Sequence, residues 1–277
     1  MSRSHRWTDE LAFATELASD AGKLLSASYE RVLRIARKSA RDVVTEVDYA
    51  SEKVALEAIR GRYPHDAILA EESGHHERLD PKGEPSGRVW VVDPLDGTVN
   101  YANGIPYFCV SVGMVDGERP AVGVVHDPLR GDTYAATADG PATLNGVRVR
   151  ASGKQEIGDF VVSLAIIGRG GIGRERQIAR RIRIPRRMGS AALSLAYVAN
   201  GRFDAFVQNG GLSLWDVAAA GLIAERAGAT VSGLDGGPWW DASRRSATVS
   251  IVAAPRPHHG TLLELLAAAG TSVRTRR

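Results

Sequence analysis

The chain has 277 residues, of which 44% are hydrophobic and 24% are charged, and its formal net charge is +3 with neutral histidines. This composition is ordinary for a globular protein, and so mild a charge does not favour a nucleic-acid-binding class. No apolar run approaches the ~20 residues of a membrane span, and the N-terminus lacks the unbroken apolar stretch of a secretory signal.

The N-terminal part of the chain predicts two helices and a short strand. Apolar residues recur at helical spacing over residues 11–25, and Thr8 is the expected N-cap of this helix. A second helix is expected to begin near Thr45. The turn "YPHD" then leads into the strand "AILA", which ends at the pair Glu71 and Glu72.

Consecutive strands are predicted from Val89 to about Ala136. The apolar runs "YFCVSVGMV", "AVGVVHDP" and "DTYAATA" alternate with polar turns. Cys109 lies in the first of these runs and is the single cysteine, so it cannot form an internal disulfide. We therefore expect Cys109 to be a core residue of a cytoplasmic protein.

The C-terminal part alternates between strands and helices. "FVVSLAII", "FDAFVQ" and "VSIVAA" predict strands, whereas "GSAALSLAYVANG", "WDVAAAGLIAERAG" and "GTLLELLAAAG" predict helices. The order of two helices, several strands and then alternating elements predicts a layered α/β protein with mixed sheets. We interpret residues 1–277 as one domain, with an N-terminal half of about 1–150 and a C-terminal half of about 151–277.

Five carboxylates stand where predicted strands or helices begin or end. Each has a structural alternative: a capping box, a first-turn helix residue, a turn or a solvated loop. If they converge, their mutual repulsion requires cations, and hard oxygen ligands favour Mg²⁺. The spacing of a zinc site is absent, and the histidine pairs 75–76 and 258–259 are expected at the surface. The five residues are Asp48, Glu71, Asp93, Asp96 and Asp216.

The stretch "VWVVDPLDGTVN" combines two of these carboxylates with a turn that suits a phosphate. Asp93 and Asp96 can share cations, and Gly97 permits close approach of the backbone. Thr98 adds a hydroxyl that can orient a water molecule. We therefore expect this segment to bring metal ions and a phosphate together.

Several separate motifs of the chain resemble the inositol monophosphatase family of Mg²⁺-dependent, Li⁺-sensitive phosphatases. They are "KSARDVVTEVD", "AEESG", "WVVDPLDGTVNYANGIPYFCVSVG", "MGSAALSLAYVANGRFDA" and "LWDVAAAGLIAERAGA". The resemblance extends from about Leu11 to Ala268. It implies a layered αβαβα sandwich, a homodimer, and phosphomonoesterase activity on a small phosphorylated polyol or sugar such as inositol monophosphate.

The resemblance also implies roles for individual residues. Two or three Mg²⁺ ions are expected, held by Glu71, Asp93, the carbonyl of Leu95, Asp96 and Asp216. The catalytic residues that the resemblance implies are Glu71, Thr98 and Asp48. Because no Ser-His-Asp or Cys-His grouping can be assembled from the motifs, we expect direct attack by water without a phosphoenzyme. The substrate is expected to contact Gly97, Thr98, Gly189, Ser190, Ala191 and Asn209.

One position departs from the family pattern. Family members selective for inositol commonly carry a glutamate six residues before the Trp-Asp pair, and counting back from that pair leads here to Asn209. An amide forms hydrogen bonds but carries no charge, so inositol specificity is not implied. Related branches of the superfamily act on fructose 1,6-bisphosphate, histidinol phosphate or phosphoadenosine phosphate, and these substrates remain alternatives.

Two motifs point to other functions. "GRGGIG", residues 168–173, matches a dinucleotide-binding fingerprint but lacks the acidic residue expected about 20 residues later, so a surface loop is favoured. The segment Arg169–Arg187 holds eight arginines. We interpret it mainly as a solvated face. One alternative is a lid that contacts an anionic substrate, and the other is a nucleic-acid-binding module. We expect neither a membrane nor a nucleic-acid partner.

Overall fold

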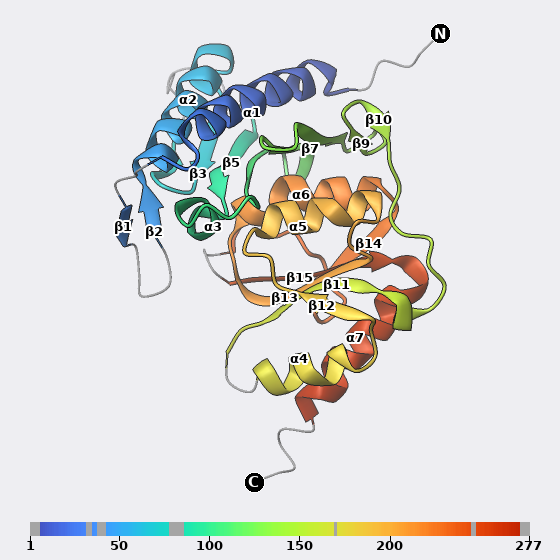
Figure 1. The fold of residues 1–277 in the computed structure, drawn as a ribbon. Coiled ribbons are helices and arrows are strands. Elements are labelled where there is room, and N and C mark those ends of the chain that lie inside the picture. Colours follow the sequence, from blue (N-terminus) through green and yellow to red (C-terminus); the bar gives the residue numbers. More distant parts are fainter. Residues whose placement is uncertain are drawn as a thin grey trace.

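The computed structural model describes residues 6–31, 35–37, 43–77, 86–168, 171–244 and 248–271. Helices and sheets alternate in five layers (Figure 1). This arrangement confirms the predicted αβαβα sandwich. The helices are α1 (Thr8–Ser28), α2 (Glu46–Arg62), α3 (Thr98–Ala102), α4 (Gly171–Ala179), α5 (Ala191–Ala196), α6 (Leu214–Arg226) and α7 (Arg256–Thr271), with 3-10 turns η1 (Ile157–Asp159) and η2 (Tyr197–Asn200).

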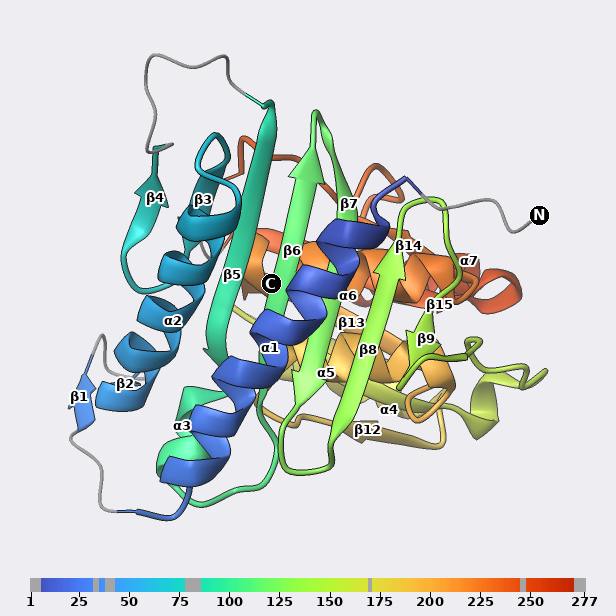
Figure 2. The same ribbon diagram turned by 90° about the horizontal axis from the view of Figure 1, so that it is seen from above.

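The first sheet has eight strands in the order β10-β9-β8-β7-β6-β5-β3-β4. β3 and β5 are parallel and the other pairs are antiparallel, so the sheet is mixed. α1 and α2 lie across one face of it (Figure 2). Its strands are β3 (Ala67–Ala70), β4 (Gly74–His76), β5 (Arg88–Asp96), β6 (Cys109–Asp116), β7 (Arg119–Asp127), β8 (Asp132–Thr137), β9 (Thr143–Leu144) and β10 (Val147–Arg148).

The second sheet has five strands in the order β12-β11-β13-β15-β14. β11 pairs in parallel with β12 and β13, whereas β15 is antiparallel to both of its neighbours. The strands are β11 (Val161–Ile166), β12 (Ile184–Arg186), β13 (Ala205–Leu212), β14 (Ala229–Ser232) and β15 (Val249–Pro255), and a separate antiparallel pair is formed by β1 (Ile35–Arg37) and β2 (Val43–Thr45).

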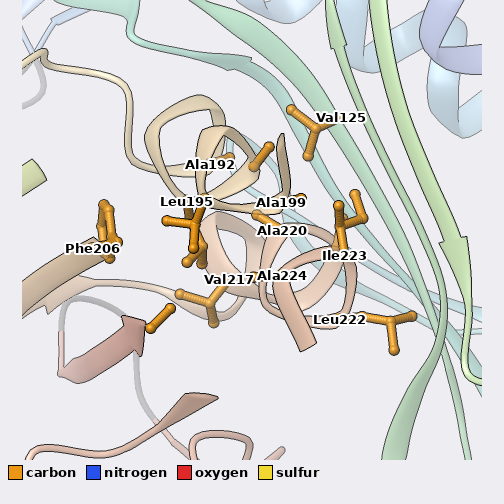
Figure 3. Close-up of a cluster of buried hydrophobic side chains, with 14 of the residues drawn as sticks. Val125, Ala192, Leu195, Ala199, Phe206, Val217, Ala220, Leu222, Ile223 and Ala224 are labelled. Atoms are coloured by element: carbon orange, nitrogen blue, oxygen red, sulfur yellow. The ribbon is translucent and has the colours of Figure 1, made fainter. Parts of the chain in front are cut away.

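α5 and α6 form the central layer between the two sheets. Their apolar side chains pack against one another, with Val125 of β7 on one side and Phe206 of β13 on the other (Figure 3). α6 approaches β7 closely because Gly123 has no side chain there. A Cβ on Gly123 would lie 2.6 Å from the carbonyl oxygen of Ala219. The core therefore fixes where the N-terminus of α6 meets the first sheet.

The two N-terminal helices begin in different ways. α2 has the predicted capping box, in which the Thr45 hydroxyl accepts from the Val47 amide and Asp48 accepts from the Thr45 amide at 2.8 Å. In α1 the predicted cap was wrong, because Thr8 is already helical and Trp7 is the N-cap residue. Trp7 is fixed instead by its indole Nε1, which donates to Asp116 at 3.2 Å.

The second histidine pair is buried, so its expected surface location was wrong. His258 and His259 lie in the first turn of α7, where only 9% and 7% of their surfaces are exposed. His259 donates from Nε2 to the Ser232 hydroxyl, whose own proton goes to the carbonyl of Gly233. Burial lowers the pKa of His259, which favours the neutral ring. Among the described residues, no helix is long and apolar enough to span a membrane.

Candidate active site

The site begins at an irregularity near the end of β5. In a regular strand, residues three apart point to opposite faces of the sheet. The pairing of β5 with β6 shifts register between Asp93 and Asp96, where Pro94 provides no amide hydrogen. The shift allows both carboxylates to turn toward one point. Carboxylate oxygens of Asp93, Asp96 and Asp216 lie within 4.8 Å of one another.

The first turn of α6 supplies the third carboxylate. Ser213 and Asp216 form a capping box, and Asp216 accepts from the Ser213 amide at 2.6 Å. A carboxylate is favoured at this position by the positive end of the helix dipole. Asp216 therefore has the structural role expected for it, in the first turn of a helix, and it also belongs to the acidic cluster.

Glu71 joins the cluster from β3. Its amide donates to the carbonyl of Val92 at 3.2 Å, which aligns Glu71 beside Asp93 on the neighbouring parallel strand. The two side chains share a hydrogen bond, and the Glu71 charge contributes to the raised pKa of Asp93. Four of the five predicted carboxylates thus meet at the ends of three elements.

The electrostatics of the cluster fit a divalent cation. Burial, and then the charges of Glu71, Asp96 and Asp216, hold the pKa of Asp93 well above its ordinary range. Burial also raises the pKa of Asp96, although hydrogen bonds from Ser190 and from the start of α5 oppose the shift. Closely spaced, buried carboxylates are the hard ligands that Mg²⁺ and related ions select.

Asp48 reaches the site through Thr98. Asp48 is fully buried, and its Oδ1 lies 2.9 Å from the Thr98 hydroxyl, which is also 3.0 Å from the carbonyl of Leu95. The single hydroxyl proton can satisfy only one of these acceptors at a time. The Leu95 amide donates to Asp93 at 3.0 Å. These bonds fix the turn that links the carboxylates to α3.

Two glycines bring the backbone of this turn close to the start of α5. Gly97 has φ 101°, and a Cβ there would lie 3.0 Å from the carbonyl oxygen of Tyr107 and 3.2 Å from Cβ of Ser190. Gly189 has φ 84°, and a Cβ there would lie 2.9 Å from the side chain of Asn100. A larger residue at either position would be strained, which explains why these glycines occur here.

The Asp96 carboxylate connects the two halves of the site. It accepts hydrogen bonds from the Ser190 hydroxyl at 2.5 Å and from the amides of Ala191 and Ala192 at 3.2 and 2.7 Å. Cys109 lies beside it, with Sγ 3.8 Å from the Asp96 carboxylate, and burial raises the pKa of the thiol. The expectation that Cys109 belongs to the core is confirmed by its complete burial.

A cavity of about 520 Å³ opens beside the acidic cluster. Asp96 and Asp216 lie on its wall, together with the predicted contact residues 189–191 at the start of α5. Gln208, which the sequence analysis did not single out, also lines it, as does Arg187 at the end of the arginine-rich segment. Arg187 pairs with Glu175 at 3.1 Å and is the one cationic residue of this lining.

The structure places Asn209 outside the lining and Gln208 within it. β13 carries an irregularity between Gln208 and Leu212, where Gly210 and Gly211 both have positive φ, 76° and 78°. Over this stretch β13 has two more residues than β15, so a count back from the Trp-Asp pair does not follow a regular strand to the cavity. Asn209 instead accepts from the hydroxyl of Ser250 at 3.4 Å. The adjacent glycines were the signal that could have identified the shift.

The glycine-rich and arginine-rich motifs are described only in part. Residues 169 and 170 lie outside the described ranges, so the "GRGGIG" motif and Arg169 cannot be placed. Gly171 and Gly173 belong to the first turn of α4. From Arg174 onward the segment forms α4, a turn and β12, and most of its arginines are exposed. This arrangement agrees with the predicted solvated face.

Comparisons with known proteins identify the family to which the chain belongs. The chain matches the family described as "Inositol monophosphatase family" over residues 7–272. The Nus factor SuhB of Pseudomonas aeruginosa is 39% identical over 241 residues, which covers 82% of this chain and 86% of that protein.

Two solved structures resemble the fold closely. An IMPase of Thermotoga maritima has a TM-score of 0.84 at 30% identity and covers 96% of this chain and 100% of that one. The inositol monophosphatase of Anabaena (Nostoc) has a TM-score of 0.79 at 33% identity, with 95% and 97% covered. The chain belongs to the inositol monophosphatase family.

Proposed function

We propose that the protein is a Mg²⁺-dependent phosphomonoesterase that hydrolyses a small phosphorylated polyol or sugar, such as inositol monophosphate. The observation that carries the proposal is the convergence of Asp93, Asp96 and Asp216 beside a cavity of about 520 Å³. Glu71 completes a set of four carboxylates whose mutual repulsion a bound cation would relieve.

The proposed metal ligands are Glu71, Asp93, the carbonyl of Leu95, Asp96 and Asp216, which would hold two or three Mg²⁺ ions. When bound, the ions supply positive charge that stabilises the attacking and leaving oxygens of a phosphoryl displacement. Glu71 and Thr98 orient the attacking water in line with phosphorus, and Glu71 accepts its proton. Asp48 holds the Thr98 hydroxyl at 2.9 Å and so sets the direction of its lone pairs.

We assign the phosphate and the alcohol part of the substrate to different places beside the acidic cluster. We assign the phosphate to the backbone at Gly97 and Thr98, where glycine permits close approach. We assign the alcohol to the start of α5, at Gly189, Ser190 and Ala191. The Gln208 amide forms hydrogen bonds with hydroxyl groups without adding charge, so we expect broad acceptance of neutral polyol esters.

A phosphatase assay with a substrate panel tests the proposal. The panel contains inositol 1-phosphate, histidinol phosphate, fructose 1,6-bisphosphate and phosphoadenosine phosphate. We expect Mg²⁺-dependent release of phosphate, inhibition by millimolar Li⁺ and no phosphate on the protein after rapid acid quench. Full turnover in excess EDTA would contradict the metal requirement, and ³¹P signal retained covalently on the protein would contradict direct attack by water.

We also propose that the protein is a cytoplasmic homodimer, as the family resemblance implies. Light scattering coupled to gel filtration tests the dimer directly. A single peak at about twice the chain mass of 29.6 kDa is the expected result. A peak at the monomer mass would contradict it.

A second candidate function is binding of nucleic acid through the arginine-rich face. Arg176, Arg180 and Arg181 are exposed on α4 and the turn after it, and no ion pair joins them to a described residue. The relative from Pseudomonas aeruginosa is named a Nus factor. Salt-dependent binding of RNA that is lost when all three arginines become glutamine would support this function. Unchanged binding would exclude this face.

A further inference from the structure

Glu52 is a buried carboxylate that lies beside the acidic cluster but outside it. It belongs to the face of α2 that contacts the hairpin of β3 and β4, and only 3% of its surface is exposed. A buried carboxylate without hydrogen bonds would be strongly destabilising. Its two oxygens are both used, because Oε2 accepts from the Glu72 amide at 2.7 Å and Oε1 accepts from the Ser73 hydroxyl.

The hydrogen bonds around Glu52 form a series in which each group donates to the next, from Arg60 to Glu52. Arg60 can only donate, so the Nδ1 atom of His76, 3.0 Å from the Arg60 Nη2 atom, must accept. His76 then carries its proton on Nε2 and donates to the Ser73 hydroxyl at 2.6 Å. Ser73 in turn donates to Glu52. His76 is therefore a structural member of this hairpin and not an isolated surface residue.

This series of hydrogen bonds holds the backbone on the C-terminal side of Glu71. The Glu71 amide is already held by the carbonyl of Val92 on β5. The next amide, that of Glu72, is held by Glu52. Two successive peptide groups are thus anchored to two different elements, β5 and α2, and the Glu71 side chain projects from the point between them toward Asp93.

We propose that Glu52 is a positioning residue that holds Glu71 in the geometry required for cation binding. The inference rests on the proposed function, because it assigns Glu71 to the metal site. Glu52 forms no part of the Asp93, Asp96 and Asp216 group, so it acts through the Glu72 amide and the Ser73 hydroxyl. Groups that orient metal ligands in this way commonly change metal affinity by roughly 10–100-fold when they are removed.

Two substitutions separate the two hydrogen bonds of Glu52. Glu52→Ala removes both acceptors. Glu52→Gln keeps an oxygen for the Glu72 amide, but its NH₂ group must donate to the Ser73 hydroxyl, whose own proton then loses its acceptor. Glu57→Gln is the matched control, because Glu57 is an exposed carboxylate on the same helix, 3.8 Å from Lys53.

Three measurements on the full-length protein test the proposal. In EDTA-treated protein, hydrogen–deuterium exchange of the Glu72 amide should be at least about 10-fold faster in Glu52→Ala, with Glu52→Gln intermediate. Calorimetric titration with Mn²⁺ should show a dissociation constant raised by about 10–100-fold in Glu52→Ala. The kcat of Glu52→Ala should be closer to the wild-type value at saturating Mg²⁺ than at low Mg²⁺. Glu57→Gln should match the wild type in every measurement.

Wild-type Mn²⁺ affinity and wild-type exchange in Glu52→Ala would overturn the proposal. If Glu52→Ala does not fold, as circular dichroism would reveal, Ser73→Ala and Glu52→Gln provide the same comparison with smaller changes, and unaltered affinity in both would overturn it. A wild-type protein that hydrolyses every phosphate ester without divalent cations would instead refute the proposed function. The two failures are therefore distinguishable.

Discussion

Asp48 and Asp216 each serve two purposes that are usually treated as alternatives. Both accept a backbone amide in the capping box of a helix, α2 and α6 respectively. Both also face the proposed reaction, Asp48 through Thr98 and Asp216 directly. A helix cap fixes the side-chain direction to within a narrow range. Capping is therefore the means by which these carboxylates are oriented.

Replacing Glu71 by glutamine should reduce turnover without unfolding the protein. The change keeps the shape of the side chain but removes a charge from the cluster and the expected proton acceptor. We expect kcat to fall by on the order of 10²–10⁴, the usual contribution of a positioned acid–base group. Steady-state kinetics with circular dichroism checks this, and Glu72→Gln, on the same turn, is the control. Near-wild-type turnover in Glu71→Gln would contradict the assigned role.

The pair Gln208 and Asn209 gives a direct test of which residue contacts the substrate. Gln208 lines the cavity and Asn209 does not, so Gln208→Glu should favour polyol esters over anionic ones, whereas Asn209→Glu should not. A pocket contact of this kind discriminates by ~1–3 kcal/mol. Ratios of kcat/KM for inositol 1-phosphate and fructose 1,6-bisphosphate measure the effect. A selectivity change confined to Asn209→Glu would restore the role first expected for Asn209.

At the scale of elements, regular periodicity was readable from the sequence and irregularity was not. The helical spacing in 11–25 and the alternation around Cys109 predicted α1 and β6, because core contacts repeat with the period of the element. The site carboxylates were identified by their place at element ends. Gln208 was missed because β13 has two more residues than β15 between Gln208 and Leu212, so a count back from the Trp-Asp pair does not follow a regular strand. The tertiary hydrogen bonds of Glu52 left no local pattern.

The contact between α6 and β7 should tolerate no additional carbon. A Cβ at position 123 would meet the backbone of Ala219, at 2.6 Å from its oxygen and 2.9 Å from its Cα, so the helix must move. We expect Gly123→Ala to reduce the free energy of unfolding by about 1–3 kcal/mol, as overpacking usually does. Thermal or denaturant unfolding measures it. Gly153→Ala is the control, because no atom lies within 4 Å of a Cβ there.

At the scale of the whole molecule, the raised pKa of Asp93 means that the ionised acidic cluster opposes folding, and the proposed cation would offset this cost. Mg²⁺ at 100 times its dissociation constant should stabilise EDTA-treated protein by about 2.7 kcal/mol. In a chain of this size that corresponds to a rise in Tm of roughly 5–10 °C. Thermal unfolding with and without Mg²⁺ provides the measurement.

Asp93→Asn is the diagnostic variant for this effect. The substitution removes a buried carboxylate whose pKa is raised by burial and by three neighbouring carboxylates. The Tm without Mg²⁺ should therefore rise or remain unchanged. The response to Mg²⁺ should largely disappear. A strong loss of Tm in this variant without Mg²⁺ would show that Asp93 stabilises the fold, contrary to the electrostatic argument.

The placement of the carboxylates on β5 and α6 also has a consequence during synthesis of the chain. β5 leaves the ribosome long before α6, and Asp96 finds its partners on α5 only 94 to 96 positions later in the sequence. Contacts so distant along the chain form late in folding. The nascent N-terminal half therefore carries Glu71, Asp93 and Asp96 without the fourth carboxylate, Asp216. If a cation binds the complete set as proposed, it can do so only after translation has passed Asp216, and it would then stabilise completed chains but not truncated ones.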